Sequence, residues 1–371
     1  MNKTLRPCRA VFGTREISLS KAAERRLAIG ALLGLALLAL FFRGVDLRAL
    51  AEAFRLADPV LLAGVVLATV VTYLARSWRW GYLLAPVVRV SFCRLLSATC
   101  VGFMSGLVIP RAGELVRPWL IARRHEVTTS AAFASIILER LIDLITVVIL
   151  FGLYLYVLPR PAAESAGRLL GTLRAGGVLA GLVALAVLGL LLALHLRAEA
   201  TLAVLDRALD RLPSRVAAPV SHAVRSFTAG LAVLQAPPRH LLAIAGQSLL
   251  VWLSIALGLF WNNLAFGLRL PFHATFLLLG FLTVGVAVPT PGMVGGFHEA
   301  YLLALTQAFG ASSHTAAAAG ITAHALTNVP VLLLGLFFLG REGLSLGKVA
   351  QVGGQHAQGA GARHERAAEA R

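Results

Sequence analysis

The stretch Gly177–Leu196, GVLAGLVALAVLGLLLALHL, decides the class of fold. It carries no Asp, Glu, Lys or Arg. A helix of about 20 apolar residues is long enough to cross the roughly 30 Å of bilayer hydrocarbon. Three other windows approach this length: Val60–Ala75, Ile136–Leu158 and Ala316–Leu339. Their apolar residues run on continuously instead of alternating, so the pattern predicts spanning helices.

The composition of the whole chain supports a membrane protein. Of the 371 residues, 58% are hydrophobic and 14% are charged, whereas a soluble domain carries about 25% charged residues. The net charge of +17 does not indicate nucleic-acid binding, because Lys and Arg lie between the apolar segments. Anionic lipid head groups suit these residues better. We therefore expect an all-α, polytopic helical membrane protein with about six full spans and two re-entrant or broken helical elements, about eight hydrophobic segments in all.

The basic residues predict the orientation in the membrane, since Lys and Arg are enriched in cytoplasmic loops. Five segments hold 26 of the 34 Lys and Arg residues: 1–26, 76–94, 110–127, 197–240 and 341–371. We expect both termini in the cytoplasm and the chain in the cell inner (plasma) membrane. The predicted organisation is a basic N-terminus (1–26), a membrane domain (27–340) that includes a cytoplasmic amphipathic segment (197–240), and a disordered tail (341–371).

The first apolar run, Leu27–Phe42, follows Arg25 and Arg26 as it would in a signal peptide. No small-x-small cleavage site follows Phe42. We therefore expect an uncleaved first helix.

Two apolar stretches do not fit ordinary spans. Leu95–Ile109 is short, and the charge distribution places both of its flanks on the same side. The stretch Ala274–Phe309 would be one very long helix, but it is interrupted at Pro289, Pro291, Gly292, Gly295 and Gly296. Proline removes a backbone donor and clashes with the preceding turn. A helix break at membrane depth is tolerated only where protein or a water-filled cavity surrounds it, so the two breaks predict a cavity.

Polar residues after the first break form the richest candidate site: Arg111, Gly113, Glu114, Arg117, Glu139, Arg140 and Asp143. Arginine grips an anionic oxygen with its planar fork. Two interpretations stay open for the segment Pro110–Pro118: it forms an anion site, or it is a basic turn whose charges are simply solvated. Asp143 is either functional or a structural partner of Arg140, because acids buried in a bundle are normally paired.

Other polar residues have simpler interpretations. Glu299 follows the second break and either faces the cavity or pairs with an arginine from the first half. The residues Arg76, Trp78, Arg79 and Trp80 are predicted to form an interfacial anchor. Interhelical hydrogen bonds are the expected role of Gln247, Asn262, Asn263, His324 and Asn328. Motifs for zinc (HExxH), nucleotides (Walker A) and serine hydrolases (GxSxG) do not occur, so we expect no metal and no cofactor.

Four strings carry a family resemblance: RSWRWGYLL (76–84), PRAGELVRPWLIARR (110–124), SIILERLIDL (135–144) and VPTPGMVGGFHEAYLLAL (288–305). They resemble the membrane region of lysylphosphatidylglycerol synthases and their stand-alone, flippase-like relatives, over roughly residues 25–340. The resemblance implies movement of a modified or glycan-bearing lipid between leaflets. It also implies a polar core of Arg111, Gly113, Glu114, Arg117, Glu139, Arg140 and Asp143, with Pro291, Gly292, Gly295, Gly296 and Glu299 as a second element.

Three functions follow from this resemblance and from the residues. The first is a lipid translocase that moves an anionic or modified lipid between leaflets, with the head group held by Arg111 and Arg117. The second is a membrane-embedded transferase on lipid phosphates, with Glu114 or Asp143 as general base. The third is an accessory subunit whose partners are lipid or glycan biosynthetic enzymes. Aminoacyl transfer is not expected, because the sequence ends at Arg371 without room for the soluble domain of the full-length synthases.

Overall fold

The computed structural model describes residues 47–110, 112–157, 167–197, 207, 214–287 and 290–343. The regular secondary structure of these residues is helical, with no strand among them. Several predictions fall outside them: the basic N-terminus, the first helix at Leu27–Phe42, Arg111, Pro289 and the tail after residue 343.

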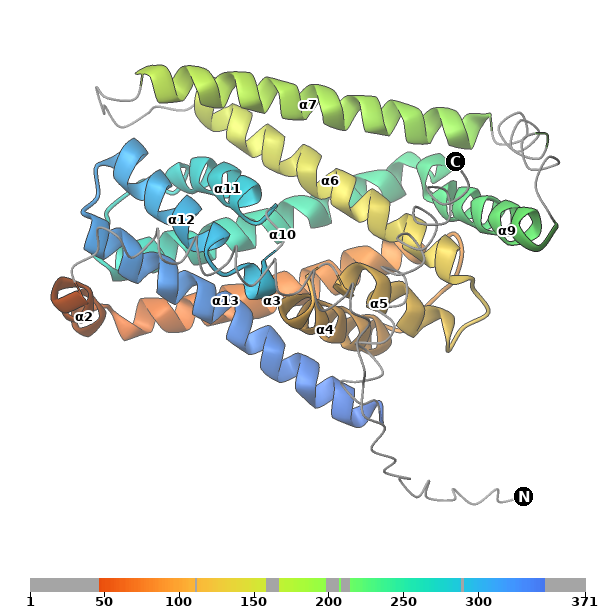
Figure 1. Ribbon diagram of the computed structural model, residues 1–371, viewed down its shortest axis with the longest axis horizontal. Coiled ribbons are helices and arrows are strands. Elements are labelled where there is room, and N and C mark those ends of the chain that lie inside the picture. The colour runs from red at the N-terminus through yellow and green to blue at the C-terminus, as the bar shows by residue number, and fades with distance from the viewer. Residues whose placement is uncertain are drawn as a thin grey trace, which may run out of the picture.

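Long helices form the frame of the bundle: α3 (Pro59–Leu84), α6 (Thr129–Tyr156), α7 (Gly167–Leu196), α10 (Pro238–Ala265) and α13 (Ser313–Arg341). They run roughly along the long axis of the molecule in Figure 1. Helices α3, α10, α13 and the Ala175–Ala193 part of α7 are long and apolar enough to cross a membrane. Helix α6 has 28 residues but carries three charges in its interior. The prediction of a polytopic all-α membrane protein is confirmed.

Small polar residues cap the N-termini of three of these helices. Asp58 caps α3 by accepting a hydrogen bond from the backbone N–H of Val60 at 2.8 Å, and Pro59 occupies the first helical position. Thr128 and Ser312 cap α6 and α13 in the same way.

The two broken stretches are helical hairpins. In the first, α4 (Phe92–Val108) packs against α5 (Ala112–Ala122). In the second, α11 (Ala274–Gly285) packs against α12 (Gly296–Leu303), which continues as the π-helical turn η4 (Ala304–Ala308). The short helix η3 (Pro291–Met293) lies between these arms. Both hairpins lie where the sequence predicted breaks.

Each hairpin has one glycine in each arm where the two backbones touch. A Cβ on Gly113 would collide with the carbonyl oxygen of Gly102, and a Cβ on Gly285 would collide with the carbonyl oxygen of Gly296. Only a hydrogen atom fits at these positions, as in other close helix contacts in membranes. The two pairs have the same separation in sequence (113 − 102 = 296 − 285 = 11). In both hairpins, therefore, the two arms approach each other closely at a pair of glycines.

The second bend needs left-handed backbone. Gly292, Met293 and Gly295 have φ of 63°, 59° and 87°. Glycine reaches this region without steric cost, whereas a side chain there is strained. The Gly-rich break is therefore a sharp, specified turn.

The hairpins enter from opposite ends of the bundle. Ser97 near the start of α4 donates a hydrogen bond to Glu342, just after α13, at 2.9 Å. At the other end, the ring of Tyr154 near the end of α6 lies 6.1 Å from that of His273, directly before α11. The hairpins point toward each other, and a Cβ on Gly292 would lie 3.8 Å from the carbonyl oxygen of Leu107. Their tips therefore meet inside the bundle (Figure 1).

The remaining helices lie at the two ends. Helix α9 (Ser214–Gly230) and the 3-10 helix η2 (Leu231–Gln235) pack at the start of α6, at the end where the first hairpin enters. Helix α2 (Leu47–Leu56) packs on α13 at the opposite end. Described arginines at the first end include Arg89, Arg94, Arg123, Arg124, Arg225, Arg239 and Arg341, and those at the second end include Arg48, Arg55 and Arg269. This asymmetry agrees with a cytoplasmic first end, which stays a prediction.

Candidate functional site

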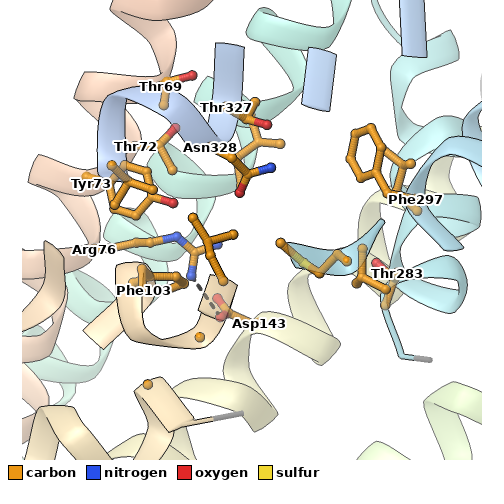
Figure 2. Close-up of a pocket in the computed structure, with 18 of the residues that line it drawn as sticks. Thr69, Thr72, Tyr73, Arg76, Phe103, Asp143, Thr283, Phe297, Thr327 and Asn328 are labelled. Carbon is orange, nitrogen blue, oxygen red and sulfur yellow. Dashed lines mark hydrogen bonds and ion pairs between the residues drawn. The ribbon is translucent and has the colours of Figure 1, made fainter. Parts of the chain in front are cut away.

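A cavity of about 550 Å³ lies where the tips of the two hairpins meet. Its walls come from α3, α6, α10 and α13 and from both hairpins. Figure 2 shows the side chains that project into it from these elements. The two broken elements thus border one cavity.

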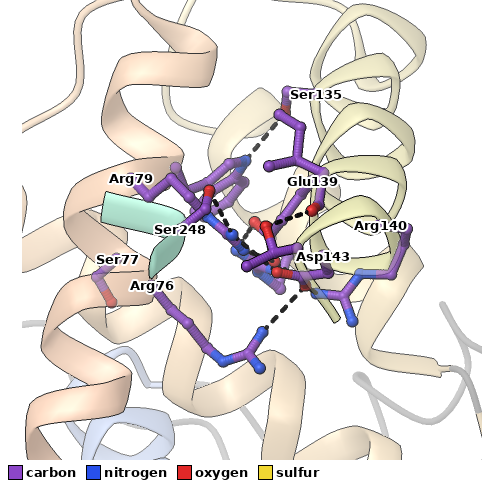
Figure 3. Close-up of polar contacts among 12 residues, drawn as sticks. Arg76, Ser77, Arg79, Ser135, Glu139, Arg140, Asp143 and Ser248 are labelled. Atoms are coloured by element: carbon purple, nitrogen blue, oxygen red, sulfur yellow. Dashed lines mark hydrogen bonds and ion pairs between the residues drawn. The ribbon is translucent and has the colours of Figure 1, made fainter. Parts of the chain in front are cut away.

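A cluster of buried charges forms one end of this cavity (Figure 3). It contains four arginines and two acids: Arg76 and Arg79 from α3, Arg117 from α5, and Glu139, Arg140 and Asp143 from α6. Arg76 and Arg79 are three residues apart and share one face of α3. Asp143 is four residues from Glu139 and three from Arg140, so it can share a face of α6 with each of them.

Two of the arginines hold the acids in place. Arg117 donates two hydrogen bonds to Glu139, at 2.8 and 2.9 Å, and its guanidinium lies 4.3 Å from the centre of the Trp80 ring. Arg79 lies 2.7 Å from a carboxylate oxygen of Asp143 and donates to Ser248 at 3.0 Å. These pairs are enclosed by protein and join α3, α5, α6 and α10.

The other two arginines line the cavity. Arg76 makes a single ion pair, 3.4 Å from Asp143, and lies over the rings of Phe103 and Trp252. Arg140 lies 2.5 Å from Glu139 and 3.3 Å from Asp143, and 38% of its side chain is exposed. Apart from the buried Nε of Arg140, the remaining donors of these two arginines lie on the cavity side of the cluster.

The charges of the cluster do not balance. Four guanidinium groups against two carboxylates leave an excess of two positive charges (4 − 2 = 2). Glu114 also lines the cavity and makes no ion pair with a described residue. Counting Glu114 leaves an excess of one positive charge (4 − 3 = 1). An uncompensated charge at membrane depth is costly, so this wall favours a bound anion.

Comparison with known proteins gives the family. Residues 27–335 match the lysylphosphatidylglycerol synthase TM region. The chain belongs to this family. Over 144 residues it is also 30% identical to Glycosyltransferase AglD of Haloferax volcanii, a match that covers 38% of this chain and 23% of that protein. The chain therefore spans less than a quarter of that relative. Family membership and the apolar helices together indicate that the chain is a multi-pass membrane protein.

The predicted interfacial anchor is wrong for three of its four residues. Arg76, Arg79 and Trp80 are 8%, 0% and 0% exposed and lie inside the bundle. The reason is that α3 continues to Leu84, while Arg76 and Arg79 find carboxylate partners on α6. Trp78, on the outer face of α3, is 49% exposed and suits an anchor.

The other predicted residues of the first element lie at or below the cavity. Gly113, Glu114, Arg117, Arg140 and Asp143 line it, while Glu139 is buried beneath. Arg111 lies outside the described residues. A solvated basic turn does not describe Arg117, which is 2% exposed. The predicted pair of Asp143 with Arg140 exists, but Arg76 and Arg79 share the same carboxylate.

The predicted second element builds the bend without lining the cavity. The residues Pro291, Gly292, Gly295, Gly296 and Glu299 are not among the lining residues. Their neighbours Thr290, Met293 and Phe297 take that place. Glu299 is not among the lining residues and forms no ion pair with a described arginine, while Arg111 lies outside the described residues. The two alternatives for Glu299 therefore stay predictions. The left-handed turns change which residues point inward.

Buried hydrogen bonds hold this bend against α10 and α13. The Nε2 atom of His324 lies 2.7 Å from the carbonyl oxygen of Gly292. The Tyr301 hydroxyl donates to Asn263 at 2.6 Å and accepts from Asn262 at 2.9 Å. The interhelical bonds predicted for Asn262, Asn263 and His324 are therefore confirmed. For Asn328 the prediction is wrong, because its amide donates to the carbonyl oxygen of His324 in its own helix. The side-chain oxygen of Gln247 has no hydrogen-bond partner among the described residues.

Sequence reasoning missed several lining residues: Thr69, Thr72, Tyr73, Trp252, Thr327 and Asn328. A signal for some of them was present. Thr69, Thr72 and Arg76 follow each other at helical spacing on α3, which predicts a polar stripe along an otherwise apolar helix.

Proposed function

We propose that this chain translocates a lipid with an anionic head group between the two leaflets of the membrane. The head group occupies the cavity and the acyl tails stay in the surrounding lipid. The observation that carries this proposal is the excess of guanidinium groups on the wall of a cavity bordered by two opposed hairpins. A phosphate oxygen there would receive charge-assisted hydrogen bonds and offset the unbalanced charge.

The geometry divides the arginines into two roles in this proposal. Both Nη atoms of Arg117 are bound to Glu139, so Arg117 positions the acid instead of gripping the head group. Arg76 and Arg140 have donors left and line the cavity, so they bind the phosphate.

Opposed hairpins suit movement across the membrane. One enters from each end of the bundle, and their tips meet beside the cavity. Because the tips belong to separate hairpins and approach each other at Gly292 and Leu107, a small shift of either hairpin would open the cavity toward its own end. The polar head group then crosses without entering hydrocarbon, where a charge costs at least about 2.5 kcal/mol.

The similarity to Glycosyltransferase AglD favours a second candidate, a role in making glycan-bearing lipids, as a transferase or beside one. The structure offers Asp143 little freedom as a general base, because it accepts from Arg76, Arg79 and Trp252. Glu114 is the acid left for such chemistry. A transferase makes a new lipid product, whereas a translocase changes only the leaflet.

The test is leaflet exchange of fluorescent phosphatidylglycerol in proteoliposomes, read by bleaching of the outer leaflet. Wild type is expected to exchange the lipid faster than protein-free vesicles, and Arg76→Ala is expected to fall to the protein-free rate. Arg269→Ala is the matched control, because Arg269 is exposed in the loop before α11. Wild type that exchanges no faster than empty vesicles contradicts translocation. A new lipid product in mass spectra would support the transferase.

A further inference from the structure

The cavity is chemically polarised. One end holds Arg76 and Arg140, which can only donate hydrogen bonds. Away from these, Thr69 of α3 and Thr327 and Asn328 of α13 form a group of hydroxyl and amide side chains (Figure 2). The two ends therefore suit different parts of a head group.

The two threonines of the polar group opposite the arginines have already used their hydroxyl hydrogens. Thr69 donates its hydroxyl hydrogen to the carbonyl oxygen of Val65 at 2.9 Å, and Thr327 donates to that of Ala323 at 2.7 Å. The amide nitrogen of Asn328 donates to the carbonyl oxygen of His324 at 2.8 Å. Back-bonded hydroxyls keep their acceptor lone pairs, and Asn328 keeps its side-chain oxygen together with one amide hydrogen. This end of the cavity therefore presents more acceptors than donors, which favours a ligand that donates.

Hydroxyl groups and ammonium groups are the two kinds of donor that a lipid head group offers. An ammonium group in a buried site needs a carboxylate, because an unpaired buried charge is costly. Glu114 and Asp143 are the acids among the described lining residues, and Asp143 is bound to the arginines. The threonine and asparagine end has no described acid, which favours neutral hydroxyl groups.

Tyr73 joins the two ends. Its ring packs edge-on against Phe103 at 5.3 Å, beside Arg76 on the same helix, and it lines the cavity. Its hydroxyl makes no hydrogen bond to a described residue. A phenol can both donate and accept, so it suits the junction between a phosphate and a polyol.

We propose that the lipid carries a phosphodiester followed by a neutral polyhydroxyl head group, such as glycerol, inositol or a sugar, instead of an ammonium-bearing one. The phosphodiester lies at Arg76 and Arg140, and the hydroxyl groups donate to Thr69, Thr327 and Asn328. This inference rests on the proposed function, because it assigns the chemistry of the same cavity.

The experiment compares three phosphodiester lipids by native mass spectrometry of the full-length protein in detergent. Phosphatidylinositol has a polyol, phosphatidylmethanol has the same charge but no donor, and phosphatidylethanolamine has an ammonium group. Each net hydrogen bond contributes about 1 kcal/mol, and 1.4 kcal/mol is tenfold in affinity. Wild type is therefore expected to bind phosphatidylinositol about tenfold or more tightly than either of the others.

Variants separate the polyol contacts from the phosphate contacts. Thr69→Val with Thr327→Val is expected to lower binding of phosphatidylinositol to the phosphatidylmethanol level and to leave phosphatidylmethanol unchanged. Thr306→Val is the matched control, since Thr306 donates to the carbonyl oxygen of Leu302 at 2.8 Å outside the cavity. If the double variant does not fold, Asn328→Leu gives the same comparison.

Two results overturn the inference: wild type that prefers phosphatidylethanolamine or shows no preference, and a folded cavity variant that keeps the preference for phosphatidylinositol. Either one leaves the proposed function intact if Arg76→Ala still weakens all three lipids. Equal binding of all three lipids by wild type and Arg76→Ala would instead contradict the phosphate site itself, and with it the proposed function.

Discussion

Arg117 and Glu139 form a bidentate ion pair that ties the second arm of the first hairpin to α6. The two bonds are 2.8 and 2.9 Å long, and the side chains are 3% and 0% exposed. Trp80 covers the guanidinium from α3 and is itself fixed by a hydrogen bond to Ser135 at 2.9 Å. A buried charge pair therefore sets where this hairpin lies.

Removing the acid of this pair should destabilise the fold strongly. Glu139→Ala leaves Arg117 buried without its carboxylate, and breaking a buried pair in this way costs about 3–5 kcal/mol. We expect a clear fall of the melting temperature in detergent. The matched control is Glu126→Ala, because Glu126 is exposed in the loop after α5. Equal melting temperatures for the two variants would show that the pair does not position the hairpin.

The glycine contact in the first hairpin should tolerate no side chain. In Gly113→Ala the new Cβ meets the carbonyl oxygen of Gly102, and backbone cannot move aside as a flexible side chain can. We expect a less stable protein with slower lipid exchange. Gly152→Ala in α6 is the control, since nothing lies within 4 Å of that Cβ and alanine favours helix by about 1 kcal/mol. A harmless Gly113→Ala would argue against close packing of the two arms.

The hairpin also predicts a labelling pattern in intact cells. In a background without Cys8, Cys93 and Cys100, single cysteines at Val88 and Glu126 flank α4 and α5 on the same side. Both should be shielded from an impermeant thiol reagent, whereas a cysteine at Arg269 should react if the second end is external. Labelling of positions 88 and 126 from opposite sides of the membrane would refute the hairpin.

Much of the fold follows from local sequence, because span length and helix breaks depend on neighbouring residues. The apolar runs around α3, α7 and α13 and the Pro and Gly interruptions predicted helices and breaks at the right places. The site is harder, because the role of a charge depends on its distant partners. Arg76 and Arg79 look like interfacial anchors until α6 brings Asp143 to them, 67 residues along the chain from Arg76.

The second break shows the same limit. The sequence indicated that Gly292 and Gly295 interrupt a helix, but not which way the chain turns at each of them. Positive φ values at these glycines and at Met293 rotate the following residues, so Phe297 reaches the cavity and Glu299 does not. A periodicity argument assumes a regular helix and fails where the backbone is left-handed.

The most direct test of the account is to find where a bound head group lies. A phosphatidylinositol analogue with a photoreactive group on its inositol ring would be activated on the full-length protein in lipid vesicles, and the labelled peptides would be identified by mass spectrometry. We predict labelling at the cavity, on peptides that contain Tyr73, Phe103 or Phe297, with loss of that label in excess phosphatidylinositol and in Arg76→Ala. Labelling confined to the outward face of α7, without competition and with the cavity peptides unmodified, would contradict the account.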